Sequence, residues 1–332
     1  MTHSRRHFLA SAGAAAVFAC AGTSRANAFA KQGMSCAFRL SVINDEITQD
    51  FGRACEIASG VMGLGWIELR GMWNKNIADL DSAEVAEARR ILEKNHLRVT
   101  DIASPLFKVN WLESNAPKDS QQPGSRNADR GAFHNEYAFK QQDQLLERCI
   151  ELAKAFQTDR IRCFDFLRLD NQAPYREAIN DKLREAAVLC AKSNQILLLE
   201  NEESCNTRTS AEAAAVLKAI PNKNFMLNWD PANAASVGDT PYPNGYAMLP
   251  KDRIGHCHCK DVVRDKEGKY HWAPVGAGII DWVGQFRSLK RDGFHYAVSL
   301  ETHWHGAGTP EESTRKSMQG LRTSLKQAGI DC

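Results

Sequence analysis

Residues 253–261, RIGHCHCKD, have the two-residue period of a β-strand. Side chains point alternately to the two faces of a strand, so the stretch divides into two rows. One row carries both histidines and the lysine: His256, His258 and Lys260. The other row carries both cysteines and the aspartate: Cys257, Cys259 and Asp261. The histidines and cysteines therefore cannot close one tetrahedral zinc site, and the two rows need separate explanations.

Short apolar runs with strand composition recur along the chain, and segments of helical period separate most of them. The strand candidates are residues 38–43, 66–71, 97–105, 160–166, 196–202, 225–233, 253–261 and 296–303. The helix candidates are residues 50–60, 82–95, 138–156, 175–193, 210–219, 281–292 and 310–328, with Asp81 and Thr309 as expected N-caps. Eight β-then-α units predict an α/β fold, a single-domain (β/α)8 TIM barrel over residues 29–332. An open doubly wound sheet is the alternative, but the first strand lacks the G-x-G-x-x-G turn of nucleotide-binding sheets.

Residues 1–28 have the build of a Tat-type signal peptide. Arg5 and Arg6 precede an alanine-rich run, and an A-x-A cleavage site follows at residues 26–28. The run is too short and too weakly apolar to span a bilayer. We expect a periplasmic or otherwise exported protein that engages the Tat export machinery. A lipoprotein attached at Cys20 and an ordinary cytosolic N-terminus are the alternatives.

Charge and cysteine usage exclude two classes of protein. The formal net charge is +2, and removing the three leader arginines, each +1, leaves −1, so no basic field for nucleic acid remains. The ten cysteines are scattered, without a C-x-x-C pair. Buried free thiols behave as small apolar side chains, and we favour this interpretation over a disulfide framework.

Two polar stretches interrupt the β-then-α pattern, at residues 111–137 and 234–248. Long loops after barrel strands lie on the face where substrates bind. We therefore expect a lid insertion at residues 111–137 and a second rim at residues 234–248, with an ordinary surface loop as the alternative for the first.

The last four strand candidates each end in a carboxylate or an imidazole directly after an apolar run. Such groups are costly to bury unless they are paired or bind a cation. Three carboxylates that converge without a cation would repel one another. Mixed oxygen and imidazole ligands suit Mn²⁺, Mg²⁺, Co²⁺ or Zn²⁺, so the pattern predicts one divalent metal ion.

Five motifs resemble the strand ends of the xylose isomerase-like TIM-barrel superfamily, which contains sugar isomerases and the ketose 3-epimerases related to tagatose and psicose epimerase. They are LLLENE (197–202), NWDPAN (228–233), HCHCKD (256–261), GAGIIDW (276–282) and SLETHW (299–304). The resemblance implies four metal ligands: Glu200, Asp230, His258 and Glu301. It also implies that Glu200 and Glu301 are the catalytic acid/base pair on opposite faces of the sugar. This superfamily often forms dimers or tetramers, so a homo-oligomer is possible.

The chain departs from the epimerase pattern at two positions that contact substrate. Asn233 stands where the epimerases have a histidine, and CKDVVR (259–264) stands where they have GE-x-N-R. These departures affect the identity of the sugar and of the reaction, and they leave the implied metal ligands intact.

The function expected from these features is that of a divalent-metal-dependent sugar isomerase or epimerase, which transfers a proton on a keto sugar through an enediolate. The candidate substrate contacts are Glu68, Asn233, Lys260, His256, Glu202 and Trp111. Structural hydrogen bonds, ion pairs and core packing are the alternative roles for these side chains. The alternative functions are a metal-dependent lyase or hydrolase of 3-keto-glycosides and a non-catalytic sugar-binding barrel.

Overall fold

Eight parallel strands form a barrel in the computed structural model, which describes residues 36–111 and 137–332. Their order around the barrel is β1-β12-β9-β8-β7-β6-β5-β2. A parallel bridge between Ile43 and Glu68 brings β1 beside β2, so the sheet is nearly closed. The barrel strands are β1 (Arg39–Val42), β2 (Trp66–Leu69), β5 (Arg98–Ile102), β6 (Arg160–Cys163), β7 (Ile196–Glu200), β8 (Phe225–Trp229), β9 (Ile254–Cys259) and β12 (Ala297–Leu300).

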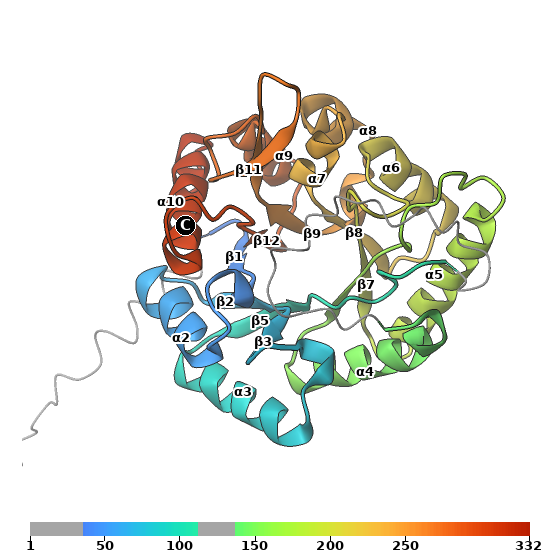
Figure 1. Ribbon diagram of the computed structural model, residues 1–332, viewed down its shortest axis with the longest axis horizontal. Helices are drawn as coiled ribbons and strands as arrows, with labels where there is room; N and C mark the ends of the chain where they lie inside the picture. Colours follow the sequence, from blue (N-terminus) through green and yellow to red (C-terminus); the bar gives the residue numbers. More distant parts are fainter. Residues whose placement is uncertain (1–35, 112–136) are drawn as a thin grey trace, which may run out of the picture.

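Helices surround the sheet on its outer side, as Figure 1 shows. They are α2 (Phe51–Glu56), α3 (Ser82–Lys94), α4 (Gln142–Ala155), α5 (Arg176–Ala191), α6 (Ser210–Ala219), α7 (Pro231–Ser236), α8 (Tyr246–Met248), α9 (Trp282–Arg291) and α10 (Pro310–Gln327). Single turns of 3-10 or π helix lie at Asn44–Glu46, Ile57–Val61, Ile77–Asp79, Phe139–Gln141, Pro241–Gly245 and Lys251–Arg253. Within the described ranges, no helix has both the length and the apolar character needed to cross a bilayer.

The predicted (β/α)8 barrel is confirmed, strand by strand. Each of the eight predicted apolar runs contains one barrel strand. Both expected N-caps are present, because Asp81 accepts from the backbone N–H of Glu84 and Thr309 from that of Glu312, each in a capping box. The predicted signal peptide, Cys20 and residues 112–136 of the expected lid lie outside the described residues.

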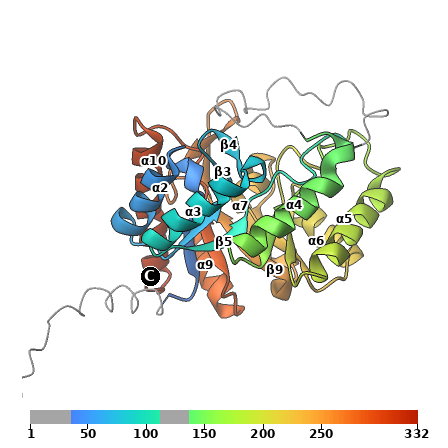
Figure 2. The ribbon, with the colours of Figure 1, turned by 90° about the horizontal axis from the view of Figure 1, so that it is seen from below.

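Two short hairpins add to the barrel: β3 (Gly71–Met72) with β4 (Lys75–Asn76), and β10 (Asp261–Arg264) with β11 (Tyr270–Ala273). The β3–β4 hairpin lies at one end of the barrel and the C-terminus toward the other (Figure 2). Residues 234–248, which were expected to form a second rim, are largely helical and pack on α9. There Tyr242 and Tyr246 hydrogen-bond through their hydroxyls to Ser288 and Asp292.

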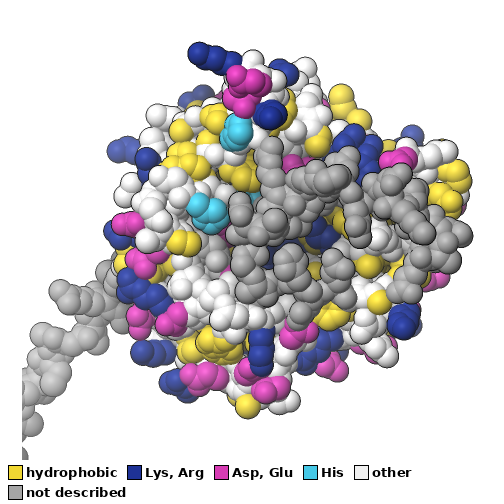
Figure 3. All heavy atoms as spheres, in the orientation of Figure 1, with side chains coloured by type: hydrophobic (Ala, Val, Ile, Leu, Met, Phe, Trp, Pro, Cys, Tyr) yellow, Lys and Arg dark blue, Asp and Glu magenta, His cyan; other side chains and the backbone are white. Residues whose placement is uncertain are grey.

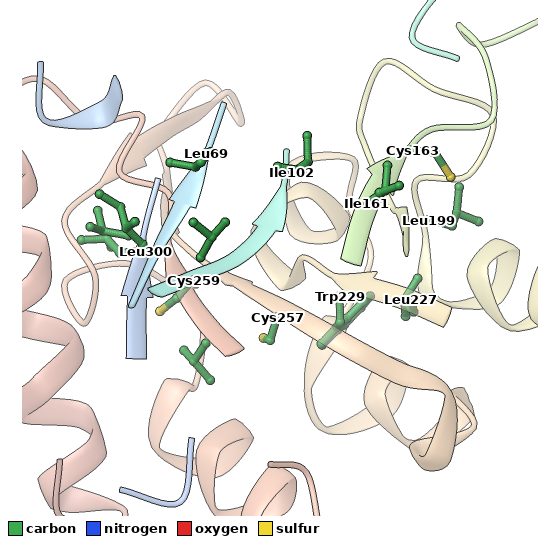
Figure 4. Packing of buried hydrophobic residues seen from close by; sticks show 14 of the residues in the cluster. Leu69, Ile102, Ile161, Cys163, Leu199, Leu227, Trp229, Cys257, Cys259 and Leu300 are labelled. Atoms are coloured by element: carbon green, nitrogen blue, oxygen red, sulfur yellow. The ribbon is translucent and has the colours of Figure 1, made fainter. Parts of the chain in front are cut away.

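The apolar core lies between the sheet and the helices, and the barrel interior is polar. Figure 4 shows Cys257, Cys259 and Trp229 among the buried apolar side chains on the helix side of the strands. Burial raises the pKa of the Cys257 thiol, so this cysteine stays protonated. The other row of β9 is also fully buried, since the His256 and His258 side chains are 0% exposed. The predicted division of RIGHCHCKD into two rows is therefore present in the barrel.

A disulfide joins the two ends of the described chain, Cys36 and Cys332, across a sequence separation of 296 residues. Among the described residues seven further cysteines are free, and all seven are buried. The prediction of buried free thiols is therefore confirmed for these seven cysteines. It is wrong for Cys36 and Cys332, which form a disulfide. The sequence distance between the pair gave no sign that the two chain ends meet at one end of the barrel.

Removing this disulfide is expected to lower the free energy of unfolding by about 2–4 kcal/mol, because a cross-link over a long loop restricts the unfolded chain. Cys36→Ser, Cys332→Ser and the double variant should be equally destabilised in urea unfolding, since each removes the same bond. Wild-type protein treated with dithiothreitol should match them. If the double variant has a clearly lower free energy of unfolding than either single variant, the thiols stabilise the fold in some other way.

Asp261 anchors the GAGII loop beside the β10–β11 hairpin. Its carboxylate accepts hydrogen bonds from the backbone N–H groups of Gly276 (2.9 Å), Gly278 (3.2 Å) and Ile280 (3.2 Å). A Cβ atom at Gly278 would lie 2.1 Å from an Asp261 oxygen, so the close approach requires glycine there. Burial raises the pKa of Asp261 to about 6, while these hydrogen bonds act to lower it. One carboxylate thus fixes the loop that follows the hairpin.

Asp261→Ala is expected to destabilise the fold by about 2–3 kcal/mol, because it leaves the buried N–H groups of Val262 and Ile280 without acceptors. Urea unfolding measures the change. Asp181→Ala is the matched control, since its carboxylate is 54% exposed and pairs with Arg184 on one helix. That control should change stability by about 0.5 kcal/mol or less. Equal effects in the two variants would remove Asp261 from this anchoring role.

Candidate active site

Four adjacent strands bring the predicted metal ligands together at the carboxyl end of the barrel. Glu200 ends β7, Asp230 follows β8, His258 lies near the end of β9 and Glu301 follows β12. The strands are hydrogen-bonded in the order β12-β9-β8-β7, with Ser299 of β12 opposite His258. One ligand atom from each of the four residues lies within 4.8 Å of the others, and all four residues are buried. The structure thus brings together the set that the resemblance implied.

Asp230 is fixed by the backbone that follows its strand. Its carboxylate accepts a hydrogen bond from the backbone N–H of Asn233 (2.8 Å) and caps α7. Its own N–H donates to the side-chain oxygen of Asn201 (2.8 Å). Burial and the nearby Glu301 and Glu200 carboxylates raise the pKa of Asp230 to about 7, against the opposing effect of Lys260. Asp230 therefore takes up a proton more readily than an ordinary aspartate, even though the Lys260 ammonium lies 3.0 Å from it.

Nitrogen-bearing side chains surround Glu301. Lys260 Nζ lies 2.7 Å from its Oε2, while Arg70 Nη1 (2.9 Å) and His303 Nε2 (3.0 Å) lie close to its Oε1. Burial acts to raise the pKa of Glu301, but His303 and Lys260 outweigh burial and hold that pKa well below its usual range. Glu301 is therefore ionised in the neutral pH range.

His303 adopts a backbone conformation that side chains rarely take. Its φ is 47°, in the left-handed region, which costs roughly 1–2 kcal/mol for a residue other than glycine. Its backbone N–H donates to Glu46 Oε2 (2.9 Å), which holds this conformation in place. This strained backbone conformation places the imidazole of His303 beside Glu301 at the end of β12.

His258 presents its two ring nitrogens to different groups. Nδ1 lies 3.1 Å from Glu200, 3.4 Å from Glu301 and 3.9 Å from Asp230. Nε2 lies 3.0 Å from Glu68 Oε1, on the other side of the ring. A carboxylate behind a metal-binding histidine orients the ring and sets its tautomer. Glu68, a predicted substrate contact, therefore lies where it can orient His258.

His256 lies deeper in the barrel, beyond Glu68. Its Nε2 is 3.2 Å from Glu68 Oε2 and its Nδ1 is 3.6 Å from Asp101 Oδ1. Burial raises the pKa of Asp101 to about 6, with Glu68 adding to the effect. Glu68 thus contacts both histidines, and His256 is part of the polar barrel interior below His258.

The remaining predicted contacts lie around the ligand set. Asn233 donates to the Asn201 backbone oxygen (2.9 Å) and reaches Glu200 Oε1 (3.4 Å), so it helps to position Glu200. Glu202 pairs with Lys108 at 3.3 Å. Trp111 is 7% exposed and packs against the Phe166 ring at 4.7 Å, so the structure places its indole in an aromatic cluster.

The buried oxygens test whether a divalent ion fits this site. Glu200 Oε2 and Asp230 Oδ2 are buried without a hydrogen-bond donor, although Arg162 (3.1 Å) and Lys260 (3.0 Å) lie near them as ionic neighbours. Three carboxylates and one imidazole within 4.8 Å of one another match the donors that Mn²⁺, Mg²⁺, Co²⁺ and Zn²⁺ accept. The residues present therefore fit a divalent metal ion.

The predicted site residues did not include two parts of this site. Arg70 contacts Asp45 (2.9 Å) and Glu46 (2.7 Å) as well as Glu301, and Arg162 pairs with Glu200 (3.1 Å). Two signals in the sequence pointed to the first of these parts: Arg70 lies at the end of the second strand candidate, and Asp45 and Glu46 come directly after the first strand.

Polar groups gather at the ends of the barrel strands, where active sites of (β/α)8 barrels lie, and four of them could hold a metal ion. The family model described as "Xylose isomerase-like TIM barrel" matches residues 60–324, and the chain belongs to this family. An L-ribulose-5-phosphate 3-epimerase, UlaE, of Escherichia coli is 22% identical over 155 residues, which are 47% of this chain and 53% of the epimerase. The chain thus spans about half the length of the curated relatives it matches.

Solved structures share the fold at low identity. The probable 3-DHS dehydratase AsbF of Bacillus anthracis has a TM-score of 0.64 and 20% identity, covering 86% of this chain and 98% of that chain. The IOLI protein with a bound zinc atom has a TM-score of 0.65 and 14% identity, covering 88% and 98%. These likenesses establish the barrel architecture.

Proposed function

We propose that this protein is a divalent-metal-dependent sugar isomerase or epimerase that transfers a proton next to the carbonyl of a keto sugar. One observation carries the proposal: Glu200 and Glu301 come from the outer two of four adjacent strands, with Asp230 and His258 between them. Two carboxylates on opposite sides of a bound substrate can remove a proton from one face and return one to the other. The epimerase similar to this chain acts on a keto sugar phosphate, which supports the same class of reaction.

Each residue has a defined task in this proposal. Glu200, Asp230, His258 and Glu301 would hold one divalent ion, which supplies positive charge beside the carbonyl oxygen and so acidifies the neighbouring C–H bond. Glu68 orients His258 through its Nε2, and Asn233 orients Glu200. Glu301, ionised at neutral pH, accepts the proton at one of its oxygens. Lys260 directs its ammonium group to where negative charge develops on a substrate oxygen.

A second candidate is a lyase that acts on 3-keto-glycosides, and the placement of Lys260 favours keeping it. Its ammonium nitrogen is 2.7 Å from Glu301 Oε2, so a base and a cation lie side by side. After proton removal by Glu301, the cation would stabilise an oxygen expelled from the neighbouring carbon. A barrel similar to this chain is described as a probable dehydratase, a reaction that also expels an oxygen.

Solvent deuterium tests the first proposal against the others. Protein loaded with Mn²⁺ is incubated in D₂O with free ketoses and with methyl 3-oxo-β-D-glucopyranoside, and the sugars are analysed by NMR. Deuterium on the carbon next to the carbonyl, lost after EDTA treatment, is the expected result. Release of methanol from the glucoside would favour the lyase. If no sugar gains deuterium or breaks down, the enzyme proposals fail and the sugar-binding barrel remains.

We also propose that the protein is exported. The twin arginine and the A-x-A site suggest the Tat route, and the Cys36–Cys332 disulfide supports an oxidising destination, because such bonds persist outside the reducing cytosol. Lysine in place of both Arg5 and Arg6 should retain the protein in the cytosolic fraction. Unchanged fractionation of that variant would reject Tat export.

A further inference from the structure

The β10–β11 hairpin continues directly from the strand that bears His258 and Lys260. Asp261, the residue after Lys260, begins β10, and the chain turns back through β11 with Trp272 opposite Val262. The hairpin carries polar side chains near its tip, including His271, whose Nε2 lies 2.6 Å from Asp265 Oδ2. In Figure 3 basic, acidic and histidine side chains gather at the top of the view. The position of Trp272 is therefore tied to that of Lys260.

Trp272 contacts two of the side chains that surround Glu301. Its ring centre lies 4.9 Å from Lys260 Nζ. It also lies 5.3 Å from the His303 ring, which it meets edge to face. Both of these side chains contact the Glu301 carboxylate, at 2.7 Å and 3.0 Å. The indole is thus one side chain away from the proposed base.

The indole of Trp272 differs from those of Trp229, Trp282 and Trp66 in what lies next to it. Trp229 and Trp282 are fully buried on the helix side of the barrel, at 0% and 1% exposure. Trp66 lies at the start of β2, at the opposite end of the barrel, under the Arg98 guanidinium at 3.8 Å. Trp272 is also partly buried, but its neighbours are Lys260 and His303, which both contact Glu301.

We propose that Trp272 selects a cyclic sugar, stacking its indole on the C–H face of a pyranose ring that carries the carbonyl on a ring carbon. This inference rests on the proposed function and names its substrate class. A pyranose presents one continuous apolar face, which matches a large flat aromatic surface, whereas an open-chain sugar presents its hydroxyls in all directions. With the ring on Trp272, Lys260 and His303 meet its hydroxyl oxygens, and Glu301 meets the C–H bond next to the carbonyl.

Binding of an unreactive ring tests this selection without turnover. Methyl β-D-glucopyranoside has the ring but no carbonyl, and D-glucitol has a similar set of hydroxyls without a ring. The dissociation constants of both are measured by NMR titration of the Mn²⁺-free, Zn²⁺-loaded protein. Wild-type protein should bind the glucoside more tightly than the alditol. Trp272→Ala should weaken glucoside binding about tenfold or more and leave alditol binding unchanged.

Two further variants separate stacking from a general loss of structure. Trp272→Phe keeps a flat ring and should retain glucoside binding within about threefold. Trp66→Phe, far from the site, should change neither constant. The inference is overturned if wild-type protein does not prefer the glucoside, if Trp272→Ala binds it as tightly as wild type, or if binding of both ligands falls together.

This outcome is separable from that of the deuterium experiment. If glucoside binding depends on Trp272 but no sugar gains deuterium, the recognition of a ring holds and the proposed reaction fails. If deuterium is incorporated while Trp272→Ala leaves glucoside binding unchanged, the reaction holds and the role of Trp272 fails.

Discussion

Glu301→Gln is expected to slow proton transfer on the keto sugar by about 10²–10⁴-fold. The amide has nearly the size of the carboxylate but cannot accept the proton. Glu301 is 3% exposed, so water has little room to replace the missing base. The rate of deuterium incorporation at saturating Mn²⁺ measures the effect, with the metal content of each sample determined by mass spectrometry.

A glutamate outside the site provides the control for this substitution. Glu311 forms an ion pair with Arg53 (3.1 Å) on the outer helices, and the Arg53 side chain is 50% exposed. Glu311→Gln should leave the rate within about twofold of wild type, because exposed ion pairs contribute little. A Glu301→Gln protein that holds a full metal ion and still works at a rate close to wild type would falsify the role of Glu301 as the base.

The barrel could be predicted because its local signals agree with its global arrangement. Apolar strand runs, helical periods and the caps at Asp81 and Thr309 all indicated the same β-then-α order, and the structure follows it. The expected rim at residues 234–248 carries helical turns that its two glycines and two prolines did not indicate.

The strand ends indicated where polar site residues would gather, and the resemblance to the superfamily selected four of them as implied metal ligands. Glu200, Asp230, His258 and Glu301 each follow an apolar run, and parallel strands deliver such residues to one end. Side-chain direction was harder to predict. Glu68 follows the same rule on β2, yet its carboxylate bridges His256 and His258 inside the barrel.

Contacts between loops that are far apart in the sequence could not be predicted from the sequence pattern. Arg70 meets Asp45, 25 residues earlier, and Glu301, 231 residues later. Trp272 contacts Lys260 because a hairpin brings the chain back over 12 residues. The sequence Tyr-His-Trp at residues 270–272 does not show which of these side chains faces the site and which faces the surface. Such contacts depend on how the barrel closes, which local periodicity does not specify.

Arg70→Met is expected to destabilise the fold by about 3–5 kcal/mol, because it removes a cation that three buried carboxylates share, and removal of one partner of a buried ion pair is strongly destabilising. The guanidinium bonds at once to Asp45 (2.9 Å), Glu46 (2.7 Å) and Glu301 (2.9 Å). These three side chains are 3–4% exposed, so solvent cannot replace the lost cation. Burial acts to lower the pKa of Arg70, but Asp45, Glu46 and Glu301 outweigh burial and raise that pKa well above its usual value.

Urea unfolding in EDTA at several pH values measures this change without a contribution from bound metal. In the variant, the carboxylates that lost Arg70 take up protons more readily in the folded state than in the unfolded state. Their pKa values in the folded state therefore lie above those in the unfolded state. That proton uptake stabilises the variant at low pH and is lost as the pH rises. The loss of unfolding free energy relative to wild type should therefore be smaller at pH 5 than at pH 8. Arg53→Met, which breaks the exposed pair with Glu311, should cost about 0–1 kcal/mol. A deficit for Arg70→Met as small as that of Arg53→Met, or one that grows toward acid, would show that the three carboxylates do not depend on Arg70 for their charge.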